Sequence, residues 1–308
     1  MRTERTAVLM YHRVLPEQRL AFGHPSCYHL RGTAVTPDEL EAHLDWLVAQ
    51  RIPVVPLADV LIACAQHRQP PAGVVLTFDD GYAEWLTEVA PRLQERQMSA
   101  SFFVSTGVHA EAARAHPIDE YYFILDHACQ PMVELTLPDG SSVVADLTRR
   151  QDKESLVHGP LKQWILCGSE ILQSQLLTSL RNVLRGPPPD ALAAALYLPR
   201  AAWAKLAQGG SQVEAHGHSH RRLTALTDAQ IDQELATCLT SLKPHVGDAR
   251  CFAYPDGAAD ARVAARVAAS GLGGALGVVP GDVTATSDLF HLPRYFVTGG
   301  LPLGELLQ

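Results

Sequence analysis

The sequence predicts an α/β fold in which parallel strands alternate with helices. Short apolar runs, typical of buried strands, alternate with amphipathic helical stretches in both flanks of the chain. Polar side chains that can carry chemistry follow several of these runs, at the strand ends where parallel α/β folds gather their active groups. The alternation stops in the middle of the chain. We therefore expect a main domain formed by residues 1–107 and 199–308, with residues 108–198 inserted into it.

Eight apolar segments are the expected strands of the main domain. Each is short, and glycine or proline residues bound several of them, as is usual for buried strands. The expected strands cover residues 8–11, 53–55, 73–78, 100–104, 213–215, 251–254, 274–279 and 292–297. Most are separated by helices, which favours a parallel sheet.

The helices between these strands are indicated by start signals and apolar faces. Thr36, Pro37 and Glu39 combine a capping box with proline at the first helical position, and leucines on one face follow. A second helix starts at Thr227 with a similar capping signal. The remaining expected helices cover residues 57–65, 83–97, 200–208 and 259–270.

Residues 108–198 follow a different pattern. Residues 133–137 and 143–145 flank an Asp-Gly turn, which predicts a β-hairpin. A helical stretch over residues 161–184 comes next and ends before three consecutive prolines. We interpret this block as a small subdomain that forms a lid, a wall of the substrate cleft or a subunit contact.

The composition argues against several classes of function. With 33 acidic and 25 basic side chains the formal net charge is -8, so nucleic-acid binding through a basic face is not expected. The six cysteines are scattered without a Cys-x-x-Cys pair and are interpreted as reduced thiols. No stretch is long enough to span a membrane, and the apolar run near the amino terminus is too short for a signal peptide. The expected location is therefore the cytoplasm.

Two adjacent carboxylates, Asp79 and Asp80, end an apolar strand. Buried acids are costly unless they bind a cation, pair with a base or share a proton. Three alternating histidines follow another strand, and His216 and His220 among them are four residues apart. Two imidazoles and one carboxylate with open positions suit zinc or another divalent metal, and the second carboxylate can accept a proton from water. The alternatives are a solvated turn for the aspartates and a solvated loop for the histidines.

These two motifs resemble those of the polysaccharide deacetylase superfamily, carbohydrate esterase family 4. Residues 77–82, Thr-Phe-Asp-Asp-Gly-Tyr, look like the first signature of that family. The pair of histidines at 216 and 220, followed by a leucine, looks like the second. The resemblance implies a distorted (β/α)7-type barrel and metal-dependent hydrolysis of an N-acetyl or related acyl group on a sugar.

The resemblance also assigns roles to the matching residues. It implies that Asp79 is the general base and that Asp80, His216 and His220 are the metal ligands. The family has serine or threonine after the first histidine, but Gly217 stands there in this chain. A side-chain support of the metal loop is therefore expected to be absent.

The third signature of the family is altered in this chain. Residues 252–257, Phe-Ala-Tyr-Pro-Asp-Gly, resemble it, but alanine replaces the expected arginine and Asp256 replaces the expected tyrosine. The resemblance gives Tyr254 and Asp256 a place in substrate and oxyanion binding, where a backbone N–H of Asp256 can donate whatever its side chain. Arg294, in a Leu-Pro-Arg triplet, is the expected substitute for the missing arginine. The alternative for Arg294 is a surface salt bridge.

The general-acid histidine of the family is expected at the other end of the chain. The usual carboxyl-terminal Leu-x-His is missing, and His12 instead ends the first expected strand. This order looks like the circularly permuted arrangement of some bacterial exopolysaccharide deacetylases, which a barrel allows because its first and last strands are neighbours. His12 is the expected acid that protonates the leaving amine, and a buried structural histidine is the alternative.

The sequence thus predicts a metal-dependent carbohydrate N-deacetylase. A metal-activated water would attack the amide carbonyl of an N-acylated sugar or glycan precursor. Zinc is the expected metal, and Co²⁺, Ni²⁺ or Mn²⁺ would fit the same ligands. The alternatives are hydrolysis of another C–N bond, in a formamide or cyclic amide, and a degenerate barrel that binds glycan without turnover. A homo-oligomer is left open.

Overall fold

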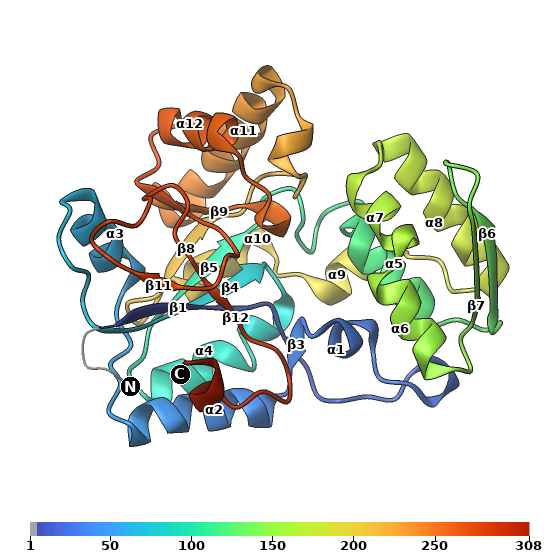
Figure 1. Cartoon of the computed structure of the whole chain (residues 1–308), viewed down its shortest axis with the longest axis horizontal. Coiled ribbons are helices and arrows are strands. Elements are labelled where there is room, and N and C mark those ends of the chain that lie inside the picture. The colour runs from blue at the N-terminus through green and yellow to red at the C-terminus, as the bar shows by residue number, and fades with distance from the viewer. Residues whose placement is uncertain (1–4, 308) are drawn as a thin grey trace.

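A curled sheet lies at the centre of the computed structural model, which describes residues 5–307 (Figure 1). Seven strands follow the order β10-β9-β8-β5-β4-β1-β11, and β12 also pairs with β1. The strands are β1 (Thr6–Tyr11), β4 (Gly73–Asp80), β5 (Ala100–Val104), β8 (Gln212–Ala215), β9 (Cys251–Ala253), β10 (Gly274–Leu276), β11 (Asp282–Val283) and β12 (Tyr295–Phe296). All neighbours are parallel except β1 and β11. The predicted (β/α)7-type fold is confirmed as an open half-barrel, and residues 1–4 and 308 of the predicted main domain lie outside the described residues.

Helices pack on this sheet, with α11 and α12 above it and α2 and α4 below it in Figure 1. They are α2 (Pro37–Ala49), α3 (Leu57–Ala65), α4 (Val89–Glu95), α10 (Arg200–Leu206), α11 (Asp228–Val246), α12 (Ala261–Ala269) and α13 (Leu303–Leu306). The predicted capping box opens α2, because Thr36 Oγ1 accepts from the N–H of Glu39 at 3.1 Å and the Glu39 carboxylate accepts from the N–H of Thr36 at 2.6 Å. Among residues 5–307, no helix has both the length and the apolar character needed to cross a lipid bilayer.

Three predicted elements differ from the observed ones for local reasons. Residues 53–55 form only a bridge between Val54 and Val74, because the flanking prolines lack an N–H. The helix expected over residues 83–97 is divided into a 3-10 helix at Ala83–Trp85 and α4, since Pro91 suits the first turn of a helix but breaks a longer one. The helix expected over residues 161–184 is two helices, because Ser169 caps the second.

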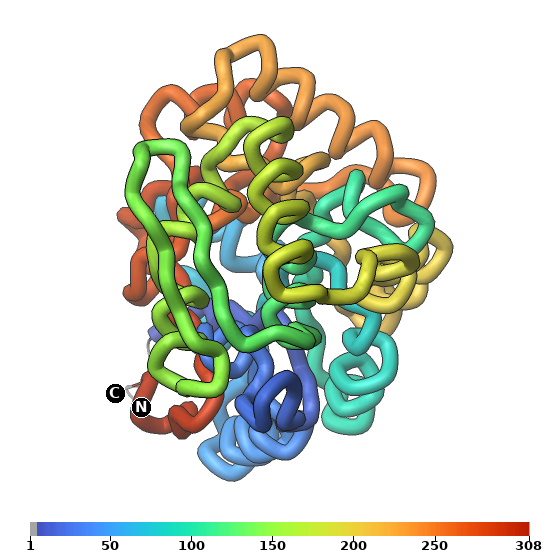
Figure 2. The backbone as a smooth tube through the Cα atoms, turned by 90° about the vertical axis from the view of Figure 1, so that its right-hand side faces the viewer, coloured from blue at the N-terminus to red at the C-terminus, as the bar shows by residue number. Residues whose placement is uncertain are grey.

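The elements between β5 and α10 lie to one side of the sheet (Figure 1), and Figure 2 shows the hairpin β6–β7 in front from that side. They are α5 (Pro117–Asp126), β6 (Met132–Thr136), β7 (Ser142–Asp146), α6 (Arg150–His158), α7 (Pro160–Cys167), α8 (Glu170–Leu184) and α9 (Leu192–Leu196). The hairpin is the predicted one. Helix α1 (Cys27–Arg31) packs on α5 and α6, and the short strands β2 (Arg13–Val14) and β3 (Ala34–Val35) connect it to the barrel. One hydrophobic cluster runs from Leu9 and Phe78 of the sheet to Tyr121 and Leu180 of this block, so the two parts share a core.

Both faces of strand β4 are buried, and its alternate side chains pack in two different hydrophobic clusters. Leu76 and Phe78 belong to the large cluster, whereas Val75 belongs to a smaller one under α3. Successive side chains of a strand point to opposite faces, so Thr77 and Asp79 share the face of Val75. The register of β4 thus fixes the direction in which Asp79 points.

Glu214 on β8 is a buried acid that the sequence did not mark. One of its oxygens accepts from the N–H groups of Arg250 and Cys251 at 2.7 and 2.9 Å. Burial raises the pKa of Glu214 from its ordinary 4.5 to about 7, against the effect of these hydrogen bonds. The folded state therefore holds a proton that the unfolded state has released between these pH values.

Because the folded state binds this proton and the unfolded state does not, the free energy of unfolding falls as pH rises from about 4.5 to about 7. We expect Glu214→Gln to remove that loss, so that the variant gains on the order of 2 kcal/mol over the wild type between pH 5 and pH 8. Chemical denaturation at both pH values measures the gain. Glu134→Gln, an exposed matched control on β6, should behave as the wild type. An equal effect of Glu214→Gln at both pH values would contradict the assignment.

Candidate active site

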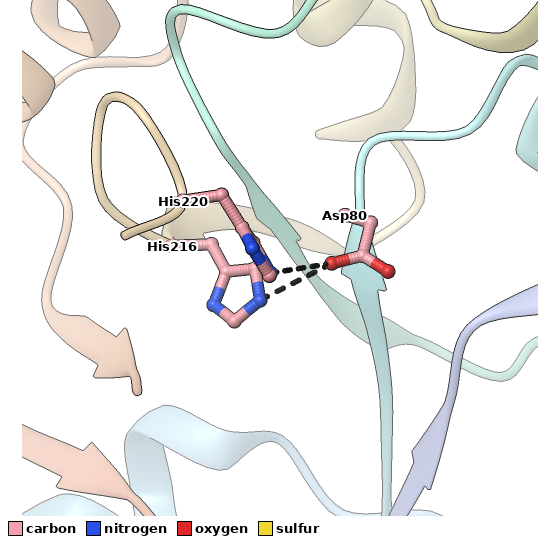
Figure 3. Close-up of side chains that lie close together, drawn as sticks. All are labelled: Asp80, His216 and His220. Atoms are coloured by element: carbon pink, nitrogen blue, oxygen red, sulfur yellow. Dashed lines mark ion pairs between the residues drawn. The ribbon is translucent and has the colours of Figure 1, made fainter. Parts of the chain in front are cut away.

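Asp80, His216 and His220 meet at the carboxyl ends of β4 and β8 (Figure 3). Nε2 of His216 lies 3.3 Å and Nε2 of His220 lies 3.1 Å from Oδ1 of Asp80. One ligand atom from each residue lies within 4.8 Å of the other two. A carboxylate oxygen and two imidazole nitrogens this close fit three ligands of a divalent metal that keeps open positions.

The backbone has positive φ angles at two of the three proposed ligands and at Gly217 in the histidine loop. Asp80 and His220 have left-handed φ angles of 91° and 56°, and Gly217 has a φ of 80°. Such angles are costly for residues with a Cβ, so surrounding contacts must hold them. In the histidine loop Glu234 of α11 provides such contacts, because it accepts from the N–H of His218 at 2.7 Å and from the hydroxyl of Ser219 at 3.0 Å.

The same carboxylate occupies the space beside Gly217. A Cβ there would lie 3.3 Å from Oε1 of Glu234. The sequence suggested that a side-chain support of the metal loop is absent. The structure shows such a support, but it comes from Glu234 rather than from a serine or threonine at position 217.

Hydrogen bonds on the far side of each imidazole direct its other nitrogen to Asp80. Nδ1 of His216 lies 2.7 Å from the carbonyl of Ala253, which can only accept, so Nδ1 carries the proton and Nε2 has the free lone pair. Nδ1 of His220 lies 3.0 Å from Nε2 of His116. Burial lowers the pKa of His220, but the hydrogen bond and charge of Asp80 raise it overall to about 9. The electrostatic field of Asp80 at His220 therefore favours a positive charge between the three side chains.

Asp79, next to Asp80 in the chain, pairs with Arg294. Nη1 and Nη2 of Arg294 lie 2.9 and 2.8 Å from the two carboxylate oxygens of Asp79, and both side chains are buried. Burial alone would raise the pKa of Asp79, but the charge of Arg294 holds it below its usual value. Arg294 also donates from Nε to the carbonyl of Gly277 at 2.8 Å, which fixes the guanidinium. Arg294 is thus a buried partner of Asp79, not a surface salt bridge.

The remaining predicted residues line the same cavity. His12 packs edge-on against Phe296, and its Nδ1 is buried without a hydrogen-bond partner among residues 5–307. Asp256 has a φ of 54°, and its side chain pairs with Arg222 at 2.9 Å. The hydroxyl of Tyr254 donates to the carbonyl of Phe290 at 2.8 Å, so only its ring is offered to a ligand.

All eight predicted site residues line one cavity of about 350 Å³. They are His12, Asp79, Asp80, His216, His220, Tyr254, Asp256 and Arg294. They come from segments up to 282 residues apart in the chain, which the curled sheet brings to one edge.

Sequence reasoning missed the contribution of the inserted block. His116, before α5, contacts His220, and Asp119 of α5 accepts from the hydroxyls of Tyr28 at 2.6 Å, Tyr82 at 3.1 Å and Tyr197. Tyr82 follows the two aspartates closely, so this network joins the block to the site. No helix was predicted from the sequence at α5, and a local pattern around Pro117 would carry no information about these long-range contacts.

Comparisons with known proteins agree with this fold. The first of the similar solved structures is the Streptococcus pyogenes deacetylase PplD in complex with acetate, with a TM-score of 0.62, 15% identity and coverage of 99% of this chain and 97% of that one. IcaB from Ammonifex degensii has a TM-score of 0.59 and 17% identity, with 96% and 92% covered. The BpsB deacetylase domain from Bordetella bronchiseptica has a TM-score of 0.56 and 18% identity, with 96% and 97% covered.

A search among curated proteins found no match. The family model described as polysaccharide deacetylase matches residues 66–149 and 194–274, which is more than half of the chain and includes Asp79, Asp80, His216 and His220. The chain therefore belongs to the polysaccharide deacetylase family.

Proposed function

We propose that this protein is a metal-dependent deacetylase that removes an N-acetyl or related N-acyl group from a sugar or glycan precursor. The observation that carries this proposal is the ionised, arginine-paired Asp79 beside the cluster of Asp80, His216 and His220. Family membership supports the carbohydrate substrate. A module that only binds glycan has no need of a base next to a metal site.

The cluster supplies the ligands. Asp80 Oδ1, His216 Nε2 and His220 Nε2 would hold the metal, with Zn²⁺ as the first choice and Co²⁺, Ni²⁺ or Mn²⁺ as alternatives for this donor set. A divalent cation held there supplies Lewis acidity, which polarises an acyl carbonyl and makes water more acidic.

Asp79 acts as the general base. It takes a proton from water as the water oxygen attacks the acyl carbon, and Arg294 positions its carboxylate during that transfer. The hydrogen bond from Nη1 and the ion pair at Nη2 of Arg294 leave the carboxylate little freedom to rotate.

Asp256 and His12 complete the reaction. The backbone N–H of Asp256 would donate to the developing oxyanion, in a turn that the Arg222–Asp256 pair braces. The ring of Tyr254 forms the adjacent wall. His12 protonates the nitrogen as the carbon–nitrogen bond breaks, which releases the carboxylate product and the free amine.

The inserted block, residues 108–198, forms a wall of the cleft in this proposal. Ile118, Tyr122 and Lys162 from this block line the cavity. The hydrophobic core that the block shares with the barrel supports a fixed wall rather than a moving lid. The predicted cytoplasmic location stays a prediction.

Acetate release from a panel of N-acetyl sugars tests the proposed reaction, with formamides and cyclic amides as competing substrates. We expect turnover of N-acetyl sugars and none of the small amides. Turnover of the small amides alone would indicate a different C–N hydrolase, and binding of sugars without acetate release would indicate a degenerate barrel.

His116 is expected to orient His220 for metal binding. For Nε2 of His220 to bind a metal, its Nδ1 must carry the proton and donate to Nε2 of His116. His116 then carries its own proton on Nδ1, so the 3.4 Å contact of that nitrogen with the N–H of Ile118 is not a hydrogen bond in this state. We expect His116→Ala to weaken Zn²⁺ binding about 10- to 100-fold, measured by competition with a chromophoric chelator. His116→Gln, whose amide oxygen can accept the same proton, should keep affinity close to that of the wild type. Equal affinities in the alanine variant and the wild type would rule out this role.

A further inference from the structure

The cavity that holds the proposed catalytic residues also has three cationic side chains in its wall. Arg31 ends α1, Lys162 lies in α7 of the inserted block, and Arg222 follows the histidine loop. Arg222 is paired with Asp256. Arg31 and Lys162 form no ion pair and no side-chain hydrogen bond with any residue of the described range 5–307. Two positive charges of the wall are therefore left without a partner.

Lys162 carries its charged ammonium in a largely buried position. The residue is only 8% exposed, and its ammonium lies 5.9 Å from the centre of the Tyr122 ring. Burial lowers the pKa of Lys162 to about 8; the charges of Arg31 and Arg222 add to this effect, and the charge of Asp256 opposes it. An ammonium held out of water without a counter-ion is unfavourable, so a ligand that supplied one would gain from it.

The carboxylates of the cavity do not fill this role. The lining acids are Asp79, Asp80, Asp119 and Asp256. Asp79 and Asp256 are paired with Arg294 and Arg222, respectively. Asp80 contacts the two imidazoles of the cluster, and Asp119 accepts from three tyrosine hydroxyls. The chain has 33 acidic side chains and a net charge of -8, yet within residues 5–307 no acid besides these four lines this cavity.

We propose that Arg31 and Lys162 form a subsite for an anionic oxygen group, a phosphate ester or a carboxylate, that the sugar substrate carries near its N-acyl group. The planar guanidinium of Arg31 can bind two oxygens of such a group side by side, and the ammonium of Lys162 adds a point charge. The partly dehydrated wall strengthens both contacts. The proposal rests on the proposed deacetylase function and gives the inserted block a role in substrate choice, through Lys162.

Three probes that share the N-acetylated sugar separate the sources of charge. They are N-acetylglucosamine 1-phosphate, N-acetylmuramic acid with its carboxylate, and the neutral methyl glycoside of N-acetylglucosamine. We expect the wild-type holoenzyme to prefer at least one anionic probe in kcat/KM, and the preference to shrink as salt rises. A preference for the phosphate or for the carboxylate identifies the group, and equal kcat/KM on all three probes would overturn the proposal.

Lys162→Met keeps the length of the buried chain and removes the charge. It should lower kcat/KM for the preferred anionic probe about tenfold and leave the neutral probe within about twofold, and Arg31→Gln should act in the same direction. Lys205→Met, an exposed lysine of α10, is the matched control and should change neither. Equal losses on the anionic and neutral probes would show that Lys162 has a structural role and would contradict the subsite.

Calorimetric titration of the anionic probe into metal-loaded Asp79→Asn protein separates the subsite from the proposed reaction. Binding that weakens about tenfold when Lys162→Met is added supports the subsite even if no probe is turned over. Turnover of all probes with unchanged anion binding in the Lys162→Met background overturns the subsite and leaves the deacetylase function intact.

Discussion

Replacing Asp79 with asparagine is expected to lower kcat for acetate release about 10³-fold, the range typical of a lost general base, while metal content stays at the wild-type level. An amide cannot accept the proton of water, although it keeps the size of the carboxylate. Asp80 and the two histidines are unchanged in this variant, so the metal site should survive. Elemental analysis of the purified protein and initial rates of acetate release measure the two quantities.

Asp59→Asn is the matched control for this experiment. Asp59 is exposed on α3, so its replacement should alter neither rate nor metal content. Wild-type turnover in the Asp79 variant would remove Asp79 from the mechanism. A loss of metal together with turnover would instead make Asp79 a ligand.

Arg294→Met is expected to have the second largest effect. It leaves the carboxylate of Asp79 buried without its partner, which costs about 3–5 kcal/mol of unfolding free energy in comparable sites. The freed carboxylate can also rotate, so we expect kcat to fall about 10²-fold with little change in KM.

Arg294→Lys separates the two consequences, because lysine restores the charge without the planar two-point contact. We expect this variant to recover most of the stability but only part of kcat, in assays at a temperature where every variant is folded. If both variants kept the wild-type kcat, Arg294 would have only a structural role.

Local signals explain how much of this fold the sequence revealed. The capping box at Thr36 and Glu39 marks α2 to the residue. The apolar run of β4 and its two terminal acids marked the site, because buried charges at a strand end need partners. The breaks at Pro91 and Ser169 were missed, although each carries a helix-start signal inside a longer apolar pattern.

Long-range contacts set the limit of sequence reasoning. Arg294 and Asp79 are 215 residues apart, and no local pattern pairs them, so only the family resemblance suggested Arg294. His116 and Glu234 brace the metal loop from 104 and 15 or 16 residues away, through contacts that exist only after the sheet has curled. In the sequence, Lys162 is one charged residue of an amphipathic helix. Its burial results from the packing of α7 against the cavity, which no local pattern predicts.

Removal and return of the metal test the central claim most directly. Protein stripped with a chelator and dialysed should release no acetate from an N-acetyl sugar, and one equivalent of Zn²⁺, or of Co²⁺, Ni²⁺ or Mn²⁺, should restore the rate. The same addition to the stripped His216→Ala variant should restore nothing, because a ligand is missing. Full acetate release by stripped protein whose metal content is below detection would contradict a metal-dependent mechanism.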